Sequence, residues 1–151
     1  MIIESKNLNE IRAKIQKIKK QNPEEIIIVK AGDENFNDKL LKMKEINIIL
    51  SPEIHDRKDR LKQRDSGLNE YLCKLAKKNK ILIAIDIDSL KELEKIEKAK
   101  ALARIKQNIQ LCKKTKTPII LFPKEKYSKL DALSLLKTLG GSTEQIKFID
   151  K

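Results

Sequence analysis

At 151 residues the chain has the length of one domain, and such a domain can bury close to two thirds of the surface that its unfolded form exposes. Hydrophobic residues make up 40% and aromatic residues only 3%, so we expect a core of Ile and Leu. The 34 Lys and Arg residues against 22 Asp and Glu residues give a net charge of +12, which favours a polyanionic partner such as nucleic acid. Codon bias or growth at high temperature explains dense charge of both signs better than it explains this surplus.

Two features of the sequence indicate the compartment. Cys73 and Cys112 lie inside helical patterns without CxxC spacing, which argues against a zinc site or disulfide framework and predicts reduced thiols. The longest apolar runs, such as Ile81–Ile85, are too short to cross a bilayer, and Glu4 stands where a signal peptide needs apolar residues. We therefore expect a cytoplasmic protein with no membrane partner.

The predicted elements alternate between strands and helices in chain order. Apolar runs predict strands at residues 2–3, 25–30, 46–50, 81–87, 119–122 and 146–149, and helical periodicity predicts helices around residues 8–18, 36–43, 68–76, 89–115 and 130–139. Asn7 or Asn9 is a candidate cap for the first helix, and Ser89 with Glu92 forms a capping box for the fourth.

This alternation predicts an α/β fold, because strands without polar alternation, each followed by a helix, form a parallel sheet covered on its faces. We expect about six strands. A doubly wound sheet and a (β/α) barrel both satisfy the pattern. A complete eight-stranded barrel ordinarily needs about 250 residues, so a barrel built from this chain would be incomplete.

In either architecture the working surface lies at the carboxyl ends of the strands. This rule brings together Lys30, Ser51–Glu53, Asp86 with Asp88, and Lys124. It also places the whole loop from Glu53 to Asp65 on that face.

The loop is dense in positive charge. Its cations are Arg57, Lys58, Arg60, Lys62 and Arg64, all within eight positions. Such density suits phosphate contacts, since several cations must neutralise a backbone charged at every nucleotide. The alternative is a solvated loop with internal pairs to Asp56, Asp59 and Asp65, and composition alone does not decide between the two.

The loop leads into a helix, and its last residues have structural interpretations. Asp65 or Ser66 can cap the helix, and Gly67 permits close approach of another backbone segment. Arg64 lies beside a helix N-terminus, where the macrodipole disfavours a cation, so it needs an anionic partner. That partner is Asp65, Asp86 or a phosphate of bound RNA.

No catalytic constellation is evident in the sequence. His55 is the single histidine, whereas metal-dependent phosphoester hydrolysis on barrel folds uses several His and carboxylate ligands. Glu53, Asp86 and Asp88 could supply Mg²⁺ ligands, but carboxylates at strand ends are more often ion-pair partners. The chain also lacks GxxxxGK[ST] and GxSxG motifs.

A second basic segment follows at residues 98–108. Helical spacing predicts Leu102, Ile105 and Ile109 on the buried face. It predicts Lys100, Arg104 and Lys106 on the solvent face, where basic side chains usually do no more than contact water.

Several motifs resemble the archaeal and eukaryotic protein component 3 of ribonuclease P. They are Leu50-Ser-Pro-Glu53, Arg64-Asp-Ser-Gly-Leu-Asn69 with Leu72-x-x-Leu-Ala-Lys-Lys-Asn79, and the strand Ile81–Ile87. Val29-Lys-Ala-Gly-Asp33 with Asn37, and Ala99–Lys114 with Arg104 and Asn108, are similar to the family's early turn and Arg-rich helix. The chain departs from the family in its shorter length, in a longer loop at Ile54–Gln63, and in Asp88 or Ser89 where the family usually has an arginine.

The resemblance implies a subunit of the ribonucleoprotein endonuclease that matures the 5′ end of precursor tRNA. It implies a single domain over residues 1–151, a truncated TIM-like (β/α) barrel of about six parallel strands with outer helices. Catalysis and Mg²⁺ would belong to the RNA, with no cofactor bound by the protein. Partners would be the ribonuclease P RNA, precursor tRNA indirectly, a small RRM-like subunit and other ribonuclease P proteins, with a homo-oligomer left open.

The expected site residues follow from charge and resemblance together. Those expected to bind RNA are Lys30, Arg57, Lys58, Arg60, Lys62, Arg64, Arg104 and Lys124, and those expected to form a structural motif are Asp65, Ser66, Gly67 and Asn69. Two other functions remain open: a metal-dependent phosphoesterase of the related barrel type, and a basic protein-interaction module.

Overall fold

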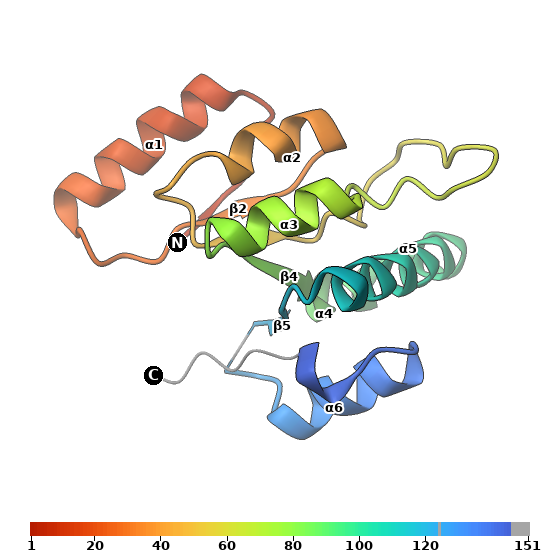
Figure 1. Cartoon of the computed structure of the whole chain (residues 1–151). Coiled ribbons are helices and arrows are strands. Elements are labelled where there is room, and N and C mark those ends of the chain that lie inside the picture. The colour runs from red at the N-terminus through yellow and green to blue at the C-terminus, as the bar shows by residue number, and fades with distance from the viewer. Residues whose placement is uncertain (124, 146–151) are drawn as a thin grey trace.

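The computed structural model describes residues 1–123 and 125–145, which form a parallel β-sheet flanked by helices (Figure 1). The strands are β1 (Ile2–Ile3), β2 (Ile28–Lys30), β3 (Ile48–Leu50), β4 (Leu82–Asp86) and β5 (Ile119–Phe122). The helices are α1 (Leu8–Gln21), α2 (Glu34–Leu41), α3 (Glu70–Lys78), α4 (Ile87–Glu92), α5 (Lys95–Thr115) and α6 (Lys129–Thr138), followed by the 3-10 turn η1 (Thr143–Gln145).

The strand order in the sheet is β1-β2-β3-β4-β5, so each strand pairs with its neighbour along the chain. All four pairings are parallel. One row of paired residues runs across the whole sheet, through Ile3, Val29, Ile49, Ile83 and Ile119. Every member of this row is at most 3% exposed, because the helices pack on this face.

The other face of the sheet is also apolar, but its contacts are different. Side chains alternate between the faces of a strand, so the residues next to that row point the other way. They form a second buried cluster made only of strand residues: Ile28, Ile48, Leu50, Leu82, Ala84 and Ile120, with Phe122 packed against it. The strands therefore lack polar alternation, as the sequence predicts.

The predicted α/β alternation is confirmed for the first five strands, and the predicted strand at 146–149 lies outside the described residues. Within the described residues the strand order does not reverse, as it would at the centre of a doubly wound sheet. The two cysteines are free and buried on α3 and α5, with their sulfur atoms 3.8 Å apart. No helix in the described part of the chain is both long and apolar enough to span a lipid bilayer.

The single helix predicted over residues 89–115 is wrong, because two helices occupy this segment. Asp86 caps α4: its side chain accepts hydrogen bonds from the amides of Asp88 and Ser89, both at 3.1 Å. Ser89 is therefore inside α4, and its hydroxyl donates to Asp86 at 2.7 Å instead of forming the expected capping box. Leu93 is extended and separates α4 from α5.

Candidate nucleic-acid interface

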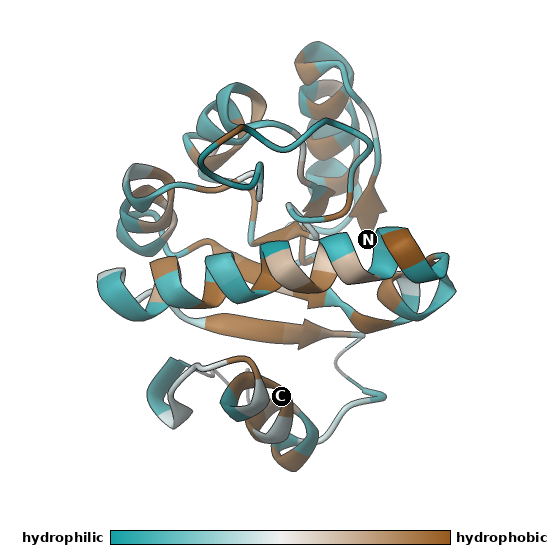
Figure 2. Cartoon of the chain, turned by 90° about the vertical axis from the view of Figure 1, so that its right-hand side faces the viewer, coloured by the Kyte–Doolittle hydropathy of each residue, from teal (hydrophilic) through white to brown (hydrophobic). Residues whose placement is uncertain are grey.

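Residues 54–65 form a long irregular loop, which we call the arm, between the end of β3 and the residues before α3. The arm projects beyond the ends of α2 and α3 (Figure 1). Its ribbon is mostly hydrophilic, in contrast to the sheet behind it (Figure 2). The prediction that this loop stands at the carboxyl edge of the sheet is confirmed, because the arm is joined to the carboxyl end of β3 by Ser51–Glu53.

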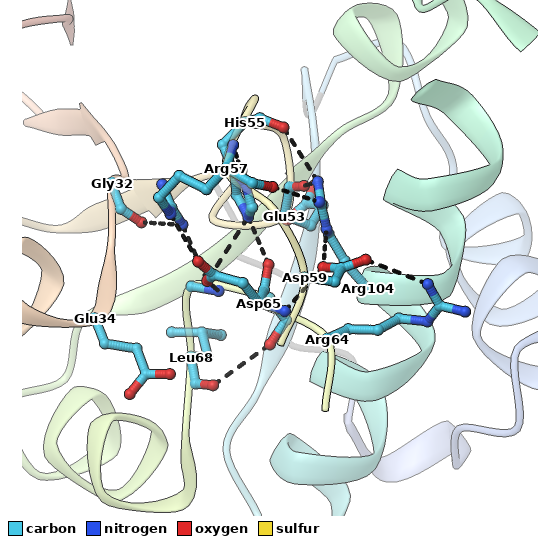
Figure 3. Close-up of polar contacts among 12 residues, drawn as sticks. Gly32, Glu34, Glu53, His55, Arg57, Asp59, Arg64, Asp65, Leu68 and Arg104 are labelled. Carbon is cyan, nitrogen blue, oxygen red and sulfur yellow. Dashed lines mark hydrogen bonds and ion pairs between the residues drawn. The ribbon is translucent and has the colours of Figure 1, made fainter. Parts of the chain in front are cut away.

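The base of the arm is held by Arg104 of α5 (Figure 3). Its guanidinium donates to the carbonyl oxygens of Glu53 at 3.3 Å, His55 at 3.1 Å and Arg57 at 3.0 Å, and to Asp59 Oδ1 at 3.0 Å. The Arg104 side chain is only 3% exposed. The prediction that it faces solvent is therefore wrong, and in this conformation its donors bind the arm and are turned away from any external phosphate.

Asp59 joins the two sides of the arm. Besides Arg104, it accepts hydrogen bonds from the Asp65 amide at 2.9 Å and from Arg64 Nη1 at 3.3 Å (Figure 3). Burial raises the pKa of Asp59, but the bonds from Arg104 and the Asp65 amide outweigh burial and hold that pKa below its ordinary value. Asp59 is thus the anionic partner of Arg64, in place of the Asp65 or Asp86 that the sequence suggested.

A second ion pair closes the arm at its base. Arg57 donates to both carboxylate oxygens of Asp65, at 2.8 and 3.2 Å, and to the carbonyl of Gly32 at 3.4 Å. The hydrogen bond from Arg57 lowers the pKa of Asp65. This bidentate geometry is the strong form of an arginine-carboxylate contact.

His55 is part of the same base. Its Nδ1 accepts from the Arg57 amide at 3.2 Å, so Nε2 carries the proton and donates to the carbonyl of Asp65. Burial lowers the pKa of His55, which favours this neutral form. Both ring nitrogens therefore bind the backbone of the arm, and His55 has a structural role.

The turn after the arm explains the Asp-Ser-Gly motif. Gly67 has φ of +73°, and a Cβ atom there would lie 2.5 Å from the carbonyl oxygen of Pro52, so the predicted close backbone approach is confirmed. Ser66 is buried and accepts from Gln107 at 3.1 Å. The predicted cap at Asp65 or Ser66 is wrong, because α3 begins later and Asn69 caps it by accepting from the Leu72 amide at 2.9 Å.

The outer part of the arm presents the other predicted cations. Arg60 pairs with Glu34 at 3.0 Å, but it and Arg64 remain 60% and 50% exposed. Lys58 and Lys62 are exposed, and neither has a carboxylate partner within the described residues. The internal pairs of the solvated-loop hypothesis are thus present at the base, and cations are open to solvent at the tip, where phosphate binding stays a prediction.

The remaining predicted cations lie apart from the arm or outside the described residues. Lys30, at the end of β2, pairs with Glu4 at 2.6 Å and is 41% exposed. A cavity of about 550 Å³ separates this strand end from the start of the arm and is lined by Lys6, Lys30, Phe36 and Arg57 among others. Lys124 lies outside the described residues.

The carboxylates considered for Mg²⁺ have other roles. Glu53 is 1% exposed, and burial raises its pKa to about 8, so its carboxyl group is protonated near neutral pH. Asp86 caps α4, and Asp88 accepts from Lys126 and from the Tyr127 hydroxyl. Residues 1–123 and 125–145 contain no group of three or more His, Cys, Asp or Glu side chains arranged to hold a metal ion.

Sequence reasoning named Asp59 only as one of three possible internal partners in the loop, and it missed Gln107, which is a second anchor from α5. Gln107 donates to the carbonyl of Arg64 at 3.0 Å and to the Ser66 hydroxyl. A signal for Gln107 was present in its spacing, three residues after Arg104, since residues three apart on a helix lie on the same side.

Comparisons with known proteins agree with the resemblance seen in the motifs. No family model matches the chain. The chain is 29% identical over 119 residues to ribonuclease P protein component 3 of Methanococcus maripaludis, and 30% identical over 117 residues to that of Methanococcus vannielii. These alignments cover 79% and 78% of this chain but 47% of each relative, so the chain spans about half the length of the curated relatives that it matches.

The fold has a counterpart of known structure. One chain of a cryo-EM structure of archaeal ribonuclease P with mature tRNA superposes with a TM-score of 0.69 and 23% sequence identity. The match covers 93% of this chain and 59% of that chain. It supports an α/β fold with a parallel sheet flanked by helices. Over most of its length the chain is therefore similar in sequence to archaeal ribonuclease P protein component 3, and similar in fold to one chain of an archaeal ribonuclease P structure.

Proposed function

We propose that this chain is a protein subunit of ribonuclease P, the ribonucleoprotein endonuclease that matures the 5′ end of precursor tRNA. The observation that carries the proposal is the arm, which holds its base in internal ion pairs and presents Lys58, Lys62 and two half-exposed arginines to solvent. The similarity to ribonuclease P protein component 3 supports it.

In this proposal the RNA performs the reaction and holds the Mg²⁺ ions, while the protein stabilises the folded RNA. Packing RNA strands together brings phosphates close to one another, and cations from the protein lower that electrostatic cost. Lys58 and Lys62 are free to bind phosphates directly. Arg60 and Arg64 are 60% and 50% exposed and can exchange a carboxylate partner for a phosphate at little cost, since ion pairs of such exposed side chains contribute at most about 1 kcal/mol.

The proposed architecture is a truncated TIM-like (β/α) barrel. Strands that follow one another in chain order are typical of barrels, and the strand-only cluster on one face corresponds to the packed interior of such a barrel.

The proposed partners are the ribonuclease P RNA, precursor tRNA through that RNA, a small RRM-like subunit and other proteins of the complex. A homo-oligomer within the complex remains a prediction, as does a cytoplasmic location. The alternative of a metal-dependent phosphoesterase has no support from His55, whose two ring nitrogens are both engaged by backbone groups.

Reconstitution with the cognate RNA tests the proposal. We expect that the purified chain alone does not cleave precursor tRNA with any divalent metal, and that adding it with its protein partner to the RNA lowers the Mg²⁺ concentration needed for cleavage. Metal-dependent cleavage by the protein alone would favour the phosphoesterase. An unchanged Mg²⁺ requirement would favour a protein-interaction module.

A further inference from the structure

The tip of the arm carries an apolar side chain that the fold does not use. Leu61 has a relative exposure of 108%, the largest among the exposed hydrophobic side chains of the described residues. Its neighbours Arg60 and Lys62 are exposed cations, and Lys58 lies three residues before it. A single exposed apolar residue is ordinary on a protein surface, but a leucine at the apex of a cationic loop combines two kinds of contact at one place.

Hydrogen bonds at Asp59 and at Arg64 hold the arm on both sides of this leucine, which limits the conformations of the loop before any partner binds. Arg104 binds three carbonyl groups and Asp59, and the Arg57–Asp65 pair closes the loop. Gln107 adds a bond to the carbonyl of Arg64 at 3.0 Å. Such preorganisation lowers the conformational entropy that is lost when a loop binds.

We propose that the tip of the arm is an RNA contact in which Leu61 packs against an unstacked base while Lys58 and Lys62 bind the phosphates on either side. The inference rests on the proposed function, and it names one point at which the chain would contact the RNA. Apolar side chains that insert beside bases, flanked by cations on the backbone, are a recurring mode of nucleic-acid binding. Proteins reach the faces of RNA bases mainly in loops, bulges and ends, where the bases are unstacked.

Charge favours RNA over a protein as the occupant. The buried centre of a protein interface is depleted in lysine, whereas here Leu61 lies between two cations and near a third. A protein pocket for Leu61 would have to bury or pair all of these charges. An RNA strand meets them with phosphates and offers the face of a base to the leucine.

Affinity for the cognate ribonuclease P RNA, measured over a series of salt concentrations, tests the inference. We expect L61S to weaken binding by roughly tenfold, the effect of losing one buried leucine contact, with the salt dependence unchanged. The control is L130S, which makes the same change at another exposed leucine (71%) on α6, separated from the arm by α5 (Figures 1 and 2). It should bind as the wild type does. Chemical probing should also show a base that is protected by the wild-type chain and reactive with L61S.

The outcomes separate this inference from the proposed function. Equal affinities of L61S and the wild type would overturn the contact and leave the proposed function intact. An L61S variant that binds RNA normally but assembles poorly with another protein subunit would place a protein at the tip and also overturn the inference. A wild-type chain that does not bind the RNA would overturn both.

Discussion

At the base of the arm, Arg104 and Arg57 are surrounded by carbonyl and carboxylate oxygens, whereas Lys58 and Lys62 at the tip are exposed and have no carboxylate partner in the described residues. All four residues are cationic, and Arg57, Lys58 and Lys62 lie within six positions of one another. The two arginines differ from the two lysines in their burial and in the number of hydrogen-bond acceptors around them. A basic loop therefore has two parts, one that builds the protein and one that is left for a partner.

The strongest test of this division removes the central anchor of the base. R104A deletes three hydrogen bonds to the arm and one to the preceding residue Glu53, and it leaves three carbonyl groups without this donor. We expect the free energy of unfolding in urea to fall by about 4 kcal/mol, as is typical when one partner of a buried ion pair is removed. R64A is the control: it removes one 3.3 Å contact of a half-exposed side chain and should cost less than about 1 kcal/mol. Similar losses in the two variants would contradict the division.

The buried carboxyl group of Glu53 predicts a pH dependence at the base. Its pKa is raised to about 8 in the folded chain, so the folded state retains a proton that the unfolded state loses above its ordinary pKa near 4.5. Stability from this group is present at low pH and is lost as pH rises toward about 8. E53Q should remove this loss and, at pH 7, stabilise the chain by about 3 kcal/mol relative to the wild type.

Urea unfolding at several pH values, on E53Q and the wild type in parallel, measures this effect. The lowered pKa of His55 has the opposite consequence, since its stabilisation grows as pH rises, and subtracting the two curves cancels it. E45Q, a change at an exposed glutamate, should keep the wild-type dependence. Parallel curves for E53Q and the wild type would show that Glu53 is charged in the folded protein.

The turn at Gly67 has a smaller predicted effect. G67A would combine a positive φ with a Cβ placed against the Pro52 carbonyl, and we expect a loss of about 2 kcal/mol in thermal or urea unfolding. G140A is the matched control, because Gly140 also has positive φ but its Cβ would meet only the flexible side chain of Gln110. A larger loss in G140A than in G67A would show that the close backbone approach is unimportant.

Much of the fold could be predicted from the sequence because apolar runs such as Ile81–Ile85 are required by a sheet that is buried on both faces. The boundary at Leu93 could not, since the capping pattern at Ser89 competes with a carboxylate cap at Asp86 that depends on where β4 ends. The local sequence therefore does not show whether Asp86 or Ser89 caps the helix, because the choice depends on the tertiary structure.

The site was harder to predict, because its key contacts join residues far apart in the chain. Arg104 was expected in solvent because the buried face of the helix was assigned to Leu102, Ile105 and Ile109, yet it lies three residues after Ala101 and four before Asn108, both of which are buried. The helical period therefore places it on the buried stripe, and its charge is satisfied by a loop more than forty residues away. Which cations of the arm have no carboxylate partner depends on the position of Arg104, because Arg104 holds the base of the arm.

The tip gives the smallest predicted effect on stability and the sharpest on binding. K58Q/K62Q removes two exposed cations without a carboxylate partner in the described residues, so the free energy of unfolding should stay within about 0.5 kcal/mol of the wild type. The slope of log affinity for the cognate RNA against log salt should fall by about 1 to 2, because each phosphate contact contributes about 0.7 to 0.9. The control K77Q/K78Q makes the same charge change at the far end of α3 and should leave the slope near that of the wild type. Equal losses in both double variants would mean that the diffuse charge of the whole chain attracts the RNA, and that the arm has no special part in binding it.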